Sequence, residues 1–297
     1  MFESIDGVGA QLREAGYLAG REAAMAVFLA ARHGRPLLVE GEPGTGKSAL
    51  AEAIAKALDT QLIRLQCYPG IDSRDALYEW NHAKQLVRAR LAGTEDQDAE
   101  QVEQELFSED FLIMRPLIRA LMHDGEQAPV LLVDDVDRAD EAFDALLLDY
   151  LAGFSVTIPG LGTIQTRRAP LVVLTSNGTR DVAPALKRRA LYLRSDHPTF
   201  EREHEILLMR APGVSSALAA EICNVVQRLR DAHMIHAPGI GESIDWAAAL
   251  VALRCDRLDA GTMVATLGCI LKHPEDFRLF REQRLIGLLE PRLDAAG

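Results

Sequence analysis

The 297-residue sequence lacks the features of several protein classes. Its four cysteines, Cys67, Cys223, Cys255 and Cys269, show neither a CxxC pair nor another metal-ligand spacing. We therefore expect reduced, mostly buried thiols instead of a disulfide framework. No apolar run approaches the roughly 18 residues that a membrane helix requires, and the first 16 residues show no basic segment followed by an apolar one. These absences predict a cytoplasmic protein without membrane insertion.

Positive charge is also scarce. Lys and Arg total 32 against 44 Asp and Glu, which gives a net charge of -12. A broad electrostatic footprint for nucleic acid is therefore missing, and we expect no nucleic-acid partner. The hydrophobic content of 48% is sufficient for the core of one large domain or two modest ones.

The pattern of apolar residues predicts two domains. Strand-like runs alternate with helical patterns in the first two thirds, at 36–39, 62–65, 130–133, 171–175 and 190–193. Such alternation is typical of a parallel sheet wrapped by helices. Beyond residue 198 the strand pattern disappears, and helices are expected at 200–210, 216–233, 244–254, 262–271 and 277–289. The prediction is an α/β domain over 1–198 and a small all-helical domain over 199–297.

Two insertions interrupt the alternation. The first spans 68–111, and its stretch 93–101 is polar and acidic enough to be solvated or mobile. The second, 154–166, consists of two alternating strands around a Pro-Gly pair and predicts a β-hairpin.

The octet GEPGTGKS at 41–48 follows the first strand and leads into a helix-forming stretch at 49–58. Glycines let the backbone turn with its N–H groups inward, toward the same point as the helix N-terminus, which is the arrangement of a phosphate-binding loop. Lys47 would reach the β- and γ-phosphates, and the Ser48 hydroxyl would hold Mg²⁺. The candidate nucleotide-binding residues are Gly41, Glu42, Pro43, Gly44, Thr45, Gly46, Lys47, Ser48 and Ala49.

This octet has a simpler alternative, a chance glycine-rich turn, which its strand and helix flanks disfavour. It also does not distinguish a kinase, a GTPase, a DNA machine or a remodelling ATPase, because all of them use it. The rest of the chain has to make that distinction.

Acidic and amide side chains follow two of the later strands. Asp134 and Asp135 end the run 130–133, where Asp134 would hold Mg²⁺ through water and Asp135 would orient the attacking water. Asn177 follows the run 171–175 and could bond a γ-phosphate or the lytic water. Each segment alone could be an ordinary turn, but the P-loop upstream favours function.

A basic cluster ends a helix near residue 189. Lys187, Arg188 and Arg189 could complement the helix C-terminus, or supply an arginine finger to a neighbouring subunit. The histidines show no HExxH or HxH spacing; His233 and His236 could bind a metal, but scattered surface histidines are much more common. We therefore expect no metal other than magnesium.

In this order, the P-loop, the paired acids, the Asn-ended strand, the terminal arginines and the helical lid resemble an AAA+ ATPase. The hairpin and the first insertion resemble the MoxR branch. Several stretches are similar to the CoxD group, the MoxR-type accessory ATPases of molybdenum-containing carbon monoxide dehydrogenases and related hydroxylases. These stretches are AGYLAGREAAMAVFLA, RLQCYPGIDSRDALYEWNHAKQL, DDVDRADEAFDALLLDYL, VTIPGLGTI, LTSNGTRDVAPALKRRALYL and IDWAAALVAL.

The resemblance implies a hexameric, ring-forming ATPase that uses ATP and Mg²⁺. Such an ATPase remodels a client molybdenum enzyme during its maturation, usually with a von Willebrand factor A-domain protein as adaptor.

Motif by motif, the resemblance also implies residue roles. Lys47 and Ser48 take the Walker A role, Asp134 and Asp135 the Walker B role, and Asn177 the first sensor role. Arg189 is the best arginine-finger candidate, and Arg188 is the second. Tyr17, with Gly16 just before the first expected helix, resembles the segment that lines the adenine pocket, although it could equally be a core residue.

Two positions depart from the general AAA+ pattern. Asp135 replaces the usual Glu and is one methylene shorter, so the base would lie about 1 Å too far from its water, a displacement that costs on the order of 100-fold in rate. Asp245 stands where many relatives have a second-sensor Arg, and we expect it to act as a helix cap or N-terminal charge. Both departures predict slow, oligomer-dependent hydrolysis.

Three other functions remain open. A nucleic-acid-associated AAA+ machine would use the same core, although the acidic charge argues against it. An ATP-gated scaffold with little hydrolysis would follow from the short Asp135 side chain. A P-loop kinase would leave the Asn-ended strand and the helical domain without a role.

Overall fold

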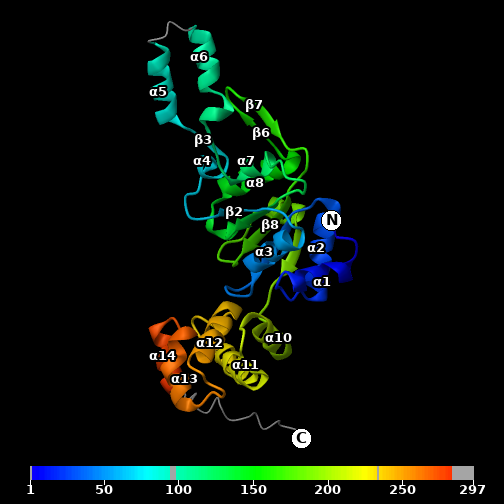
Figure 1. Ribbon diagram of the computed structural model, residues 1–297, viewed down its shortest axis with the longest axis vertical. Helices are drawn as coiled ribbons and strands as arrows, with labels where there is room; N and C mark the ends of the chain where they lie inside the picture. The colour runs from blue at the N-terminus through cyan, green and yellow to red at the C-terminus, as the bar shows by residue number, and fades with distance from the viewer. Residues whose placement is uncertain (1, 94–97, 233, 283–297) are drawn as a thin grey trace. The chain divides into compact units, whose positions relative to one another are not determined.

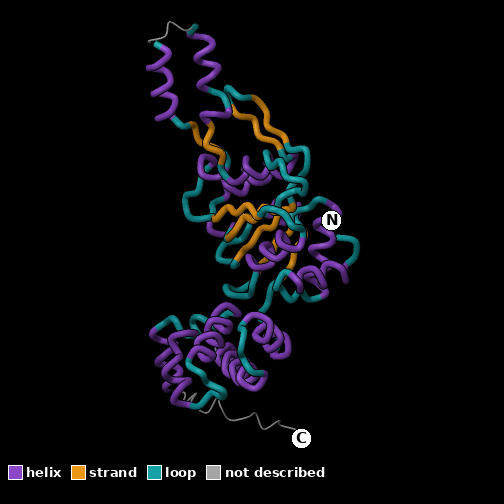
Figure 2. Tube along the Cα trace, in the orientation of Figure 1, coloured by secondary structure: helices purple, strands orange, loops and turns teal. Residues whose placement is uncertain are grey.

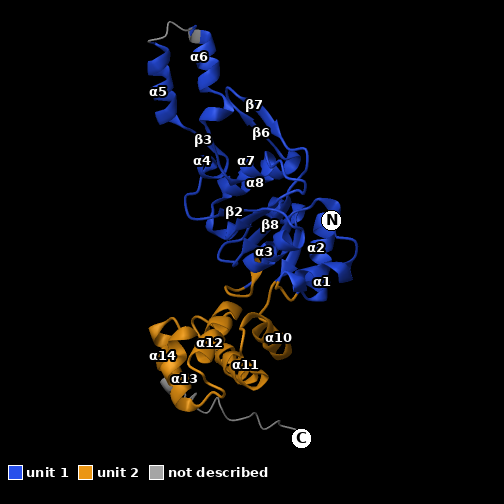
Figure 3. Cartoon of the chain, viewed as in Figure 1, with its two compact units in different colours: residues 1–15, 19–41, 48–194 blue, residues 16–18, 42–47, 195–297 orange. Residues whose placement is uncertain are grey.

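The computed structural model describes residues 2–93, 98–232 and 234–282. The chain divides into two compact units (Figure 3). Unit 1 consists of 1–15, 19–41 and 48–194, and unit 2 consists of 16–18, 42–47 and 195–297. The octet 41–48 therefore contributes its two ends to unit 1 and its middle to unit 2.

A five-stranded parallel sheet forms the centre of unit 1 (Figure 2). The strand order is β2-β5-β8-β1-β9, and every neighbouring pair is parallel. Each of the five predicted strands is confirmed with its ends within one residue, because short apolar runs are what a strand buried on both faces requires. The strands are β1 (Leu37–Glu40), β2 (Leu62–Gln66), β5 (Val130–Asp134), β8 (Leu171–Ser176) and β9 (Leu191–Arg194).

Helices cover both faces of this sheet (Figure 1). Alternate strand residues such as Leu38, Leu131 and Leu174 pack on one face with α7 (Pro116–Leu121) and α8 (Glu141–Gly153). In Figure 1, α2 and α3 lie on the other side of the sheet. Besides α7 and α8, the helices near the sheet are α1 (Ile5–Glu14), α2 (Arg21–His33), α3 (Lys47–Ala57) and the short α9 (Pro184–Arg189).

The first insertion contains two helices. These helices, α5 and α6, are joined by an ion pair in which Arg88 Nε and Nη2 donate to the two Glu105 carboxylate oxygens at 2.8 and 2.7 Å. Within the stretch 93–101, which is predicted to be solvated or mobile, Gly93, Asp98, Glu100 and Gln101 are exposed and α6 begins at Ala99, while 94–97 lie outside the described residues. Its elements are α4 (Ser73–Ala76), β3 (Tyr78–Trp80), α5 (His82–Ala92), α6 (Ala99–Leu106), η1 (Glu109–Phe111) and β4 (Leu112–Met114).

The predicted hairpin is confirmed as β6 (Ser155–Ile158) and β7 (Gly162–Gln165). Its turn touches the first insertion. A Cβ placed on Gly160, whose φ is +86°, would lie 3.0 Å from Phe107 Cβ at the end of α6. The Phe107 ring in turn meets Trp80 edge-on, with ring centroids 5.3 Å apart. The two insertions thus support each other on the same side of unit 1.

Unit 2 is largely a helical domain with its own core. Trp246 is fully buried there, and its indole N–H donates to Thr266 Oγ1 at 2.8 Å. Among the described residues, no helix has the length and apolar character needed to cross a membrane. The helices are α10 (Phe200–Arg210), α11 (Ser216–Asp231), α12 (Ile240–Ala252), α13 (Ala260–Thr266), η3 (Leu267–Cys269) and α14 (Pro274–Glu282), so the predicted helix at 262–271 ends early in a 3-10 turn.

Candidate nucleotide-binding site

Asp134 ends β5 in unit 1 and is the most heavily bonded carboxylate of the predicted site. Its Oδ1 accepts hydrogen bonds from Ser48 Oγ at 2.8 Å and from Thr175 Oγ1 at 2.5 Å. Its Oδ2 accepts one from Arg64 Nη2 at 2.5 Å. The residue is 2% exposed, so these bonds offset the cost of burying its charge. The structure brings together Ser48 and Asp134, the two residues predicted to hold Mg²⁺.

This pair of oxygens fits a magnesium ion. Mg²⁺ binds through one or two carboxylates, waters and substrate phosphates instead of a complete protein cage. The Ser48 hydroxyl and the Asp134 carboxylate are such hard oxygen donors, and they already lie within hydrogen-bond distance of each other. Within the described residues, no group of three or more His, Cys, Asp and Glu side chains is arranged to hold a metal ion.

Asp135 is held by two amides. Its Oδ1 accepts from Asn177 Nδ2 at 2.7 Å, and its Oδ2 accepts from Gln66 Nε2 at 3.0 Å. Its backbone is left-handed, with φ +55°, and its N–H donates to Thr175 Oγ1 at 2.9 Å. A non-glycine residue in this conformation costs roughly 1–2 kcal/mol, so the surrounding contacts must impose it. The carboxylate therefore has a fixed direction.

Three further residues contribute to this arrangement and were not predicted from the sequence: Arg64, Gln66 and Thr175. Gln66 ends β2 as Asn177 follows β8, and in the parallel register Gln66 stands opposite Asp134. Gln66 could have been predicted from the pattern that predicted Asn177, a polar residue at the carboxyl end of a strand-like run. Thr175 lies inside β8 and Arg64 inside β2, where only the strand order shows that they meet the acids.

Two buried groups flank the acids. Cys67, whose N–H donates to Asp134 O at 2.8 Å, has its pKa raised to about 12, first by burial and then by the charges of Asp135 and Asp134. It therefore stays a thiol and is no nucleophile. The Asp137 carboxylate accepts from Thr179 N at 2.9 Å and Thr179 Oγ1 at 2.6 Å. Burial raises its pKa, but these bonds outweigh burial and leave the pKa below its usual range.

The middle of the octet lies in unit 2. Lys47 is 6% exposed, and its ammonium donates to Glu42 O at 2.7 Å, while Thr45 Oγ1 donates to the same oxygen at 3.0 Å. Gly44 and Gly46 have φ values of +79° and +89°, which only glycine adopts without strain. At the unit 1 end, Gly41 N donates to Ser176 O at 3.1 Å. The loop has the backbone form that a phosphate cradle needs.

The start of α12 approaches the octet within unit 2. Ile240 N donates to Gly44 O at 2.8 Å, and a Cβ placed on Gly44 would lie 2.7 Å from Gly239 Cα. Glu242 completes this helix start, since its carboxylate accepts from Gly239 N at 3.1 Å. The prediction that Asp245 caps the helix is therefore wrong. Asp245 is an exposed residue beyond the first turn, because α12 begins at Ile240.

Tyr17 lies in unit 2, in the segment between α1 and α2. Gly16 and Tyr17 therefore do not precede the first helix, because α1 comes before them. A Cβ placed on Gly46 would lie 3.7 Å from the Tyr17 ring. Burial raises the pKa of Tyr17, against the opposing charge of Arg202. Its role beside an adenine stays a prediction.

The two candidate arginine fingers differ in their contacts. Arg189 Nη2 donates to Leu151 O at 2.5 Å, within its own chain. Both arginines are exposed at the end of α9, and Arg188 has no side-chain hydrogen bond or ion pair within the described residues. Of the two histidines considered as metal ligands, His233 lies outside the described residues, and the His236 ring lies 5.5 Å from that of His273.

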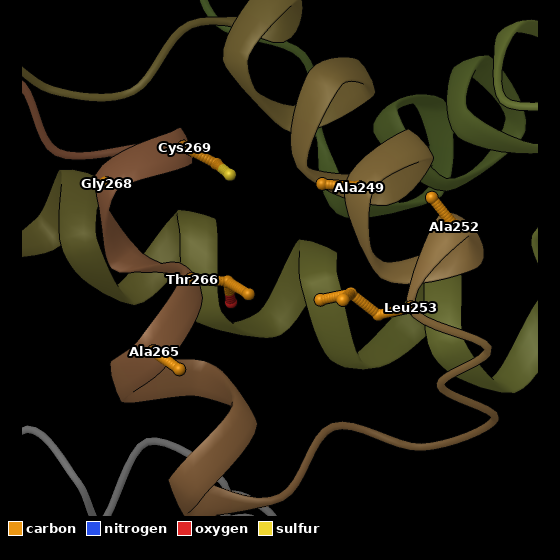
Figure 4. Close-up of a pocket in the computed structure, with 7 residues that line it drawn as sticks. All are labelled: Ala249, Ala252, Leu253, Ala265, Thr266, Gly268 and Cys269. Carbon is orange, nitrogen blue, oxygen red and sulfur yellow. The ribbon is translucent and has the colours of Figure 1, made fainter.

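A separate pocket of about 410 Å³ lies among the helices of unit 2 (Figure 4). Its polar lining group is the Thr266 hydroxyl, which already accepts from Trp246 and donates to Thr262 O at 2.7 Å. No P-loop residue or paired acid lines it, so it is not the nucleotide site. The lining residues are Ala249, Ala252, Leu253, Ala265, Thr266, Gly268 and Cys269.

The chain is similar in sequence to several known proteins. Residues 17–158 match the model of the AAA ATPase domain family. The denitrification regulatory protein NirQ of Stutzerimonas stutzeri is 26% identical over 207 residues, which cover 67% of this chain and 65% of NirQ. NirQ of Pseudomonas aeruginosa is also 26% identical, over 67% of this chain and 68% of its own. The chain thus spans slightly less than two thirds of the first relative.

Among solved structures, the RuvB Holliday junction branch migration motor of Thermotoga maritima is 18% identical. The alignment covers 97% of this chain and 78% of the RuvB chain, with a TM-score of 0.46. A variant of that motor is 19% identical over 97% and 78%, with a TM-score of 0.48. The sheet order and the P-loop give the chain the α/β fold of an AAA+ ATPase, and residues 17–158 match the AAA ATPase domain family.

Proposed function

We propose that this chain is a magnesium-dependent AAA+ ATPase of the MoxR type. The observation that carries the proposal is the bonded series Ser48, Asp134, Thr175, Asp135 and Asn177, which joins the P-loop to the ends of two neighbouring strands. If the octet served only to connect β1 to α3, these hydrogen bonds to the ends of β5 and β8 would not be needed. Hydrolysis of ATP to ADP and phosphate is the reaction that these residues fit.

Each residue would have a defined role in that reaction. Lys47, next to Ser48 in the chain, would pair with the β- and γ-phosphates after leaving the Glu42 carbonyl. Mg²⁺ held by Ser48 and Asp134 would supply charge neutralisation at the phosphates. Asp135 would orient the attacking water, and Asn177 would fix the direction of the Asp135 carboxylate. An arginine side chain from a neighbouring subunit would stabilise the negative charge of the transition state.

A direct test is phosphate release with ATP and Mg²⁺. Lys47→Ala should abolish turnover, and Asp135→Asn should abolish turnover while ATP binding, measured by calorimetry, persists. Lys272→Ala is the matched control, because this lysine is exposed and its ammonium donates to Gly268 O, away from the P-loop residues and the paired acids. Undiminished turnover in Lys47→Ala would contradict the proposal.

The cellular role that we propose is remodelling of a client metalloenzyme by a hexameric ring, with a von Willebrand factor A-domain adaptor. The resemblance to the CoxD group supports a molybdenum hydroxylase, such as carbon monoxide dehydrogenase, as client. The two mutually packed insertions offer a surface apart from the P-loop sequence, with Leu86, Val87 and Leu91 of α5 all more than half exposed.

A pulldown from the native host tests this role. The intact chain should retain the adaptor or the molybdenum enzyme, whereas a chain without residues 93–101 should lose them and keep its ATPase activity. Loss of the ATPase activity itself would instead assign this stretch a structural role. Retention of nucleic acid in place of these proteins would favour the nucleic-acid machine.

An ATP-gated scaffold is the second candidate, and the Asp135 contacts favour it. Both carboxylate oxygens of this short side chain are engaged by amides, at 2.7 and 3.0 Å, so little freedom remains to reach a water one methylene farther away. Turnover that stays near background in wild type and rises in Asp135→Glu would identify the scaffold.

A further inference from the structure

The loop between β8 and α9, residues 177–183, lies against the turn that follows the paired acids. It begins at Asn177, whose amide holds the Asp135 carboxylate. That carboxylate in turn directly precedes the short turn η2 (Val136–Arg138). Two residues into the loop, Thr179 donates to a carboxylate of η2, as described above. The amide and the carboxylate therefore begin two chain segments that are bonded to each other.

Arg180, the next residue of the loop, joins η2 to α8. Its Nη2 donates to Val136 O in η2 at 3.3 Å and to Asp144 Oδ1 in α8 at 3.0 Å. Its Nη1 donates to the other carboxylate oxygen, Asp144 Oδ2, at 2.9 Å. This fork of two bonds fixes direction as well as distance. The loop is therefore bonded to both elements beside it.

Asp144 holds the loop at two points. It is fully buried on α8, and its Oδ2 also accepts from Ala183 N at 2.9 Å. Ala183 directly precedes α9, so one carboxylate binds the middle of the loop and its end. The neighbours Phe143 and Leu147 on α8 are buried in the core of unit 1. The loop is thus tied to a helix that the core holds in place.

Stability alone does not explain this ion pair. Replacing a buried ion pair by apolar groups of similar volume is often neutral or stabilising, because burial removes both charges from water. Apolar contacts, however, are not directional, and they would let the loop shift along α8. The fork between Arg180 and Asp144 therefore accounts for a precisely placed loop better than for a stable one.

We propose that Arg180 and Asp144 are positioning residues for ATP hydrolysis, which act through Asn177 by fixing the loop that carries its amide. This inference rests on the proposed ATPase function, and it adds two residues to which the sequence motifs give no role. Without the fork, the amide would no longer hold the Asp135 carboxylate in one direction. A displacement of about 1 Å at such a site costs on the order of 100-fold in rate.

Phosphate release and calorimetry with ATP would measure kcat, KM and ATP affinity for Arg180→Met and Asp144→Asn, below the unfolding temperature of each. The kcat should fall by about 10- to 100-fold. KM and ATP affinity should stay near wild type, because the fork bonds η2 and α8 and not the P-loop. Tyr150→Phe is the matched control on α8. It removes a buried hydroxyl that donates to Leu117 O at 3.1 Å, so it should lower the unfolding temperature and keep kcat.

A double-mutant cycle tests whether Arg180 acts through Asn177. Arg180→Met should lower kcat in the wild-type background and have no further effect on kcat in Asn177→Ala, since the amide is already gone. Its effect on the unfolding temperature should be the same in both backgrounds. Arg180→Lys, which keeps the charge without the fork, should also lower kcat, and it serves if the methionine variant does not fold.

Removing both charges separates positioning from stability without relying on Asn177→Ala. The double variant Asp144→Asn with Arg180→Met leaves no uncompensated charge in the core, so its unfolding temperature should lie closer to wild type than that of either single variant. Its kcat should stay low, because no fork fixes the loop.

Several outcomes would overturn the inference. These are wild-type kcat in Arg180→Met or Arg180→Lys, independent losses of kcat from Arg180→Met and Asn177→Ala, and recovery of kcat together with stability in the double variant without charges. A fall of kcat in Tyr150→Phe would likewise show that lost stability alone lowers kcat. Each of these outcomes leaves ATP hydrolysis that depends on Lys47 in place. Full turnover in Lys47→Ala would instead overturn the proposed function itself.

Discussion

Asn177 donates from its side-chain amide to the Asp135 carboxylate, with Nδ2 2.7 Å from Oδ1. The predicted first sensor therefore acts on the predicted base directly, and Gln66 holds the other oxygen at 3.0 Å. These two amides determine where the Asp135 carboxylate points. They therefore also determine what a change in the length of this side chain does.

We predict that Asp135→Glu raises turnover by about 10- to 100-fold, since one methylene would move the carboxylate about 1 Å toward the water that it orients. Asp135→Asn should bind ATP and release no phosphate. Asp149→Glu is the control, because this exposed residue of α8 lies outside the site. Equal or lower turnover in Asp135→Glu would mean that Gln66 and Asn177 fit the shorter side chain.

We predict that Gly239→Ala disturbs the octet and that Gly241→Ala does not. A Cβ on Gly239 would lie 2.6 Å from Gly44 Cα and 2.9 Å from Gly44 O, both backbone atoms that cannot turn aside. At Gly241, in the same helix, nothing lies within 4 Å of an added Cβ. Overpacking of this kind costs typically 1–3 kcal/mol, and here it should also weaken ATP binding.

Calorimetry with ATP and thermal unfolding would measure both glycine variants. Gly241→Ala should bind ATP as wild type does and be slightly more stable, since Ala favours a helix by up to about 1 kcal/mol over Gly. Identical ATP affinity in the two variants would show that the start of α12 does not constrain the P-loop.

Sequence patterns predicted the strands better than the contacts between them. The β1, β5 and β8 runs are apolar enough to be recognised alone, and the acids and Asn177 at their ends followed from parallel pairing. The bonds from Thr175 and Arg64 to Asp134 depend on which strands are neighbours, which no local pattern contains. The same holds for Arg180, which lies 36 residues from Asp144.

One wrong prediction has a local cause. The sequence pattern predicts that a helix begins at residue 244, which would place Asp245 at its first turn. The Gly239 and Glu242 pair begins it at Ile240.

We predict that Arg230→Met strongly destabilises unit 2. Arg230 Nη1 and Nη2 donate to the two carboxylate oxygens of Glu203, at 2.6 and 2.8 Å, and Glu203 is fully buried. Removing one partner of a buried pair costs about 3–5 kcal/mol, because the other charge is left uncompensated. Denaturant unfolding would measure the loss. Arg278→Met, which breaks an exposed pair with Glu275, should leave the midpoint unchanged.

We predict that Thr179→Val makes the protein more sensitive to acid. The Thr179 bonds leave the pKa of Asp137 below its usual value despite burial, so in the folded state this carboxylate binds its proton less readily than in the unfolded chain. The resulting stability is present above the unfolded pKa of Asp and is lost as the pH falls through the folded pKa. Valine removes the hydroxyl bond and keeps the shape of the side chain, so it raises the pKa of Asp137 and lowers stability at pH 7 by about 1–3 kcal/mol.

Urea unfolding at several pH values between 7 and 3 would measure this effect. The difference between Thr179→Val and wild type should be largest near neutral pH and shrink as Asp137 becomes protonated in both proteins, because a neutral carboxyl gains less from the hydroxyl donor. Thr163→Val is the matched control, since its hydroxyl pairs with the neutral hydroxyl of Thr157 at 2.9 Å on the exposed hairpin. A stability difference that does not change with pH would show that Thr179 acts by packing and not through the charge of Asp137.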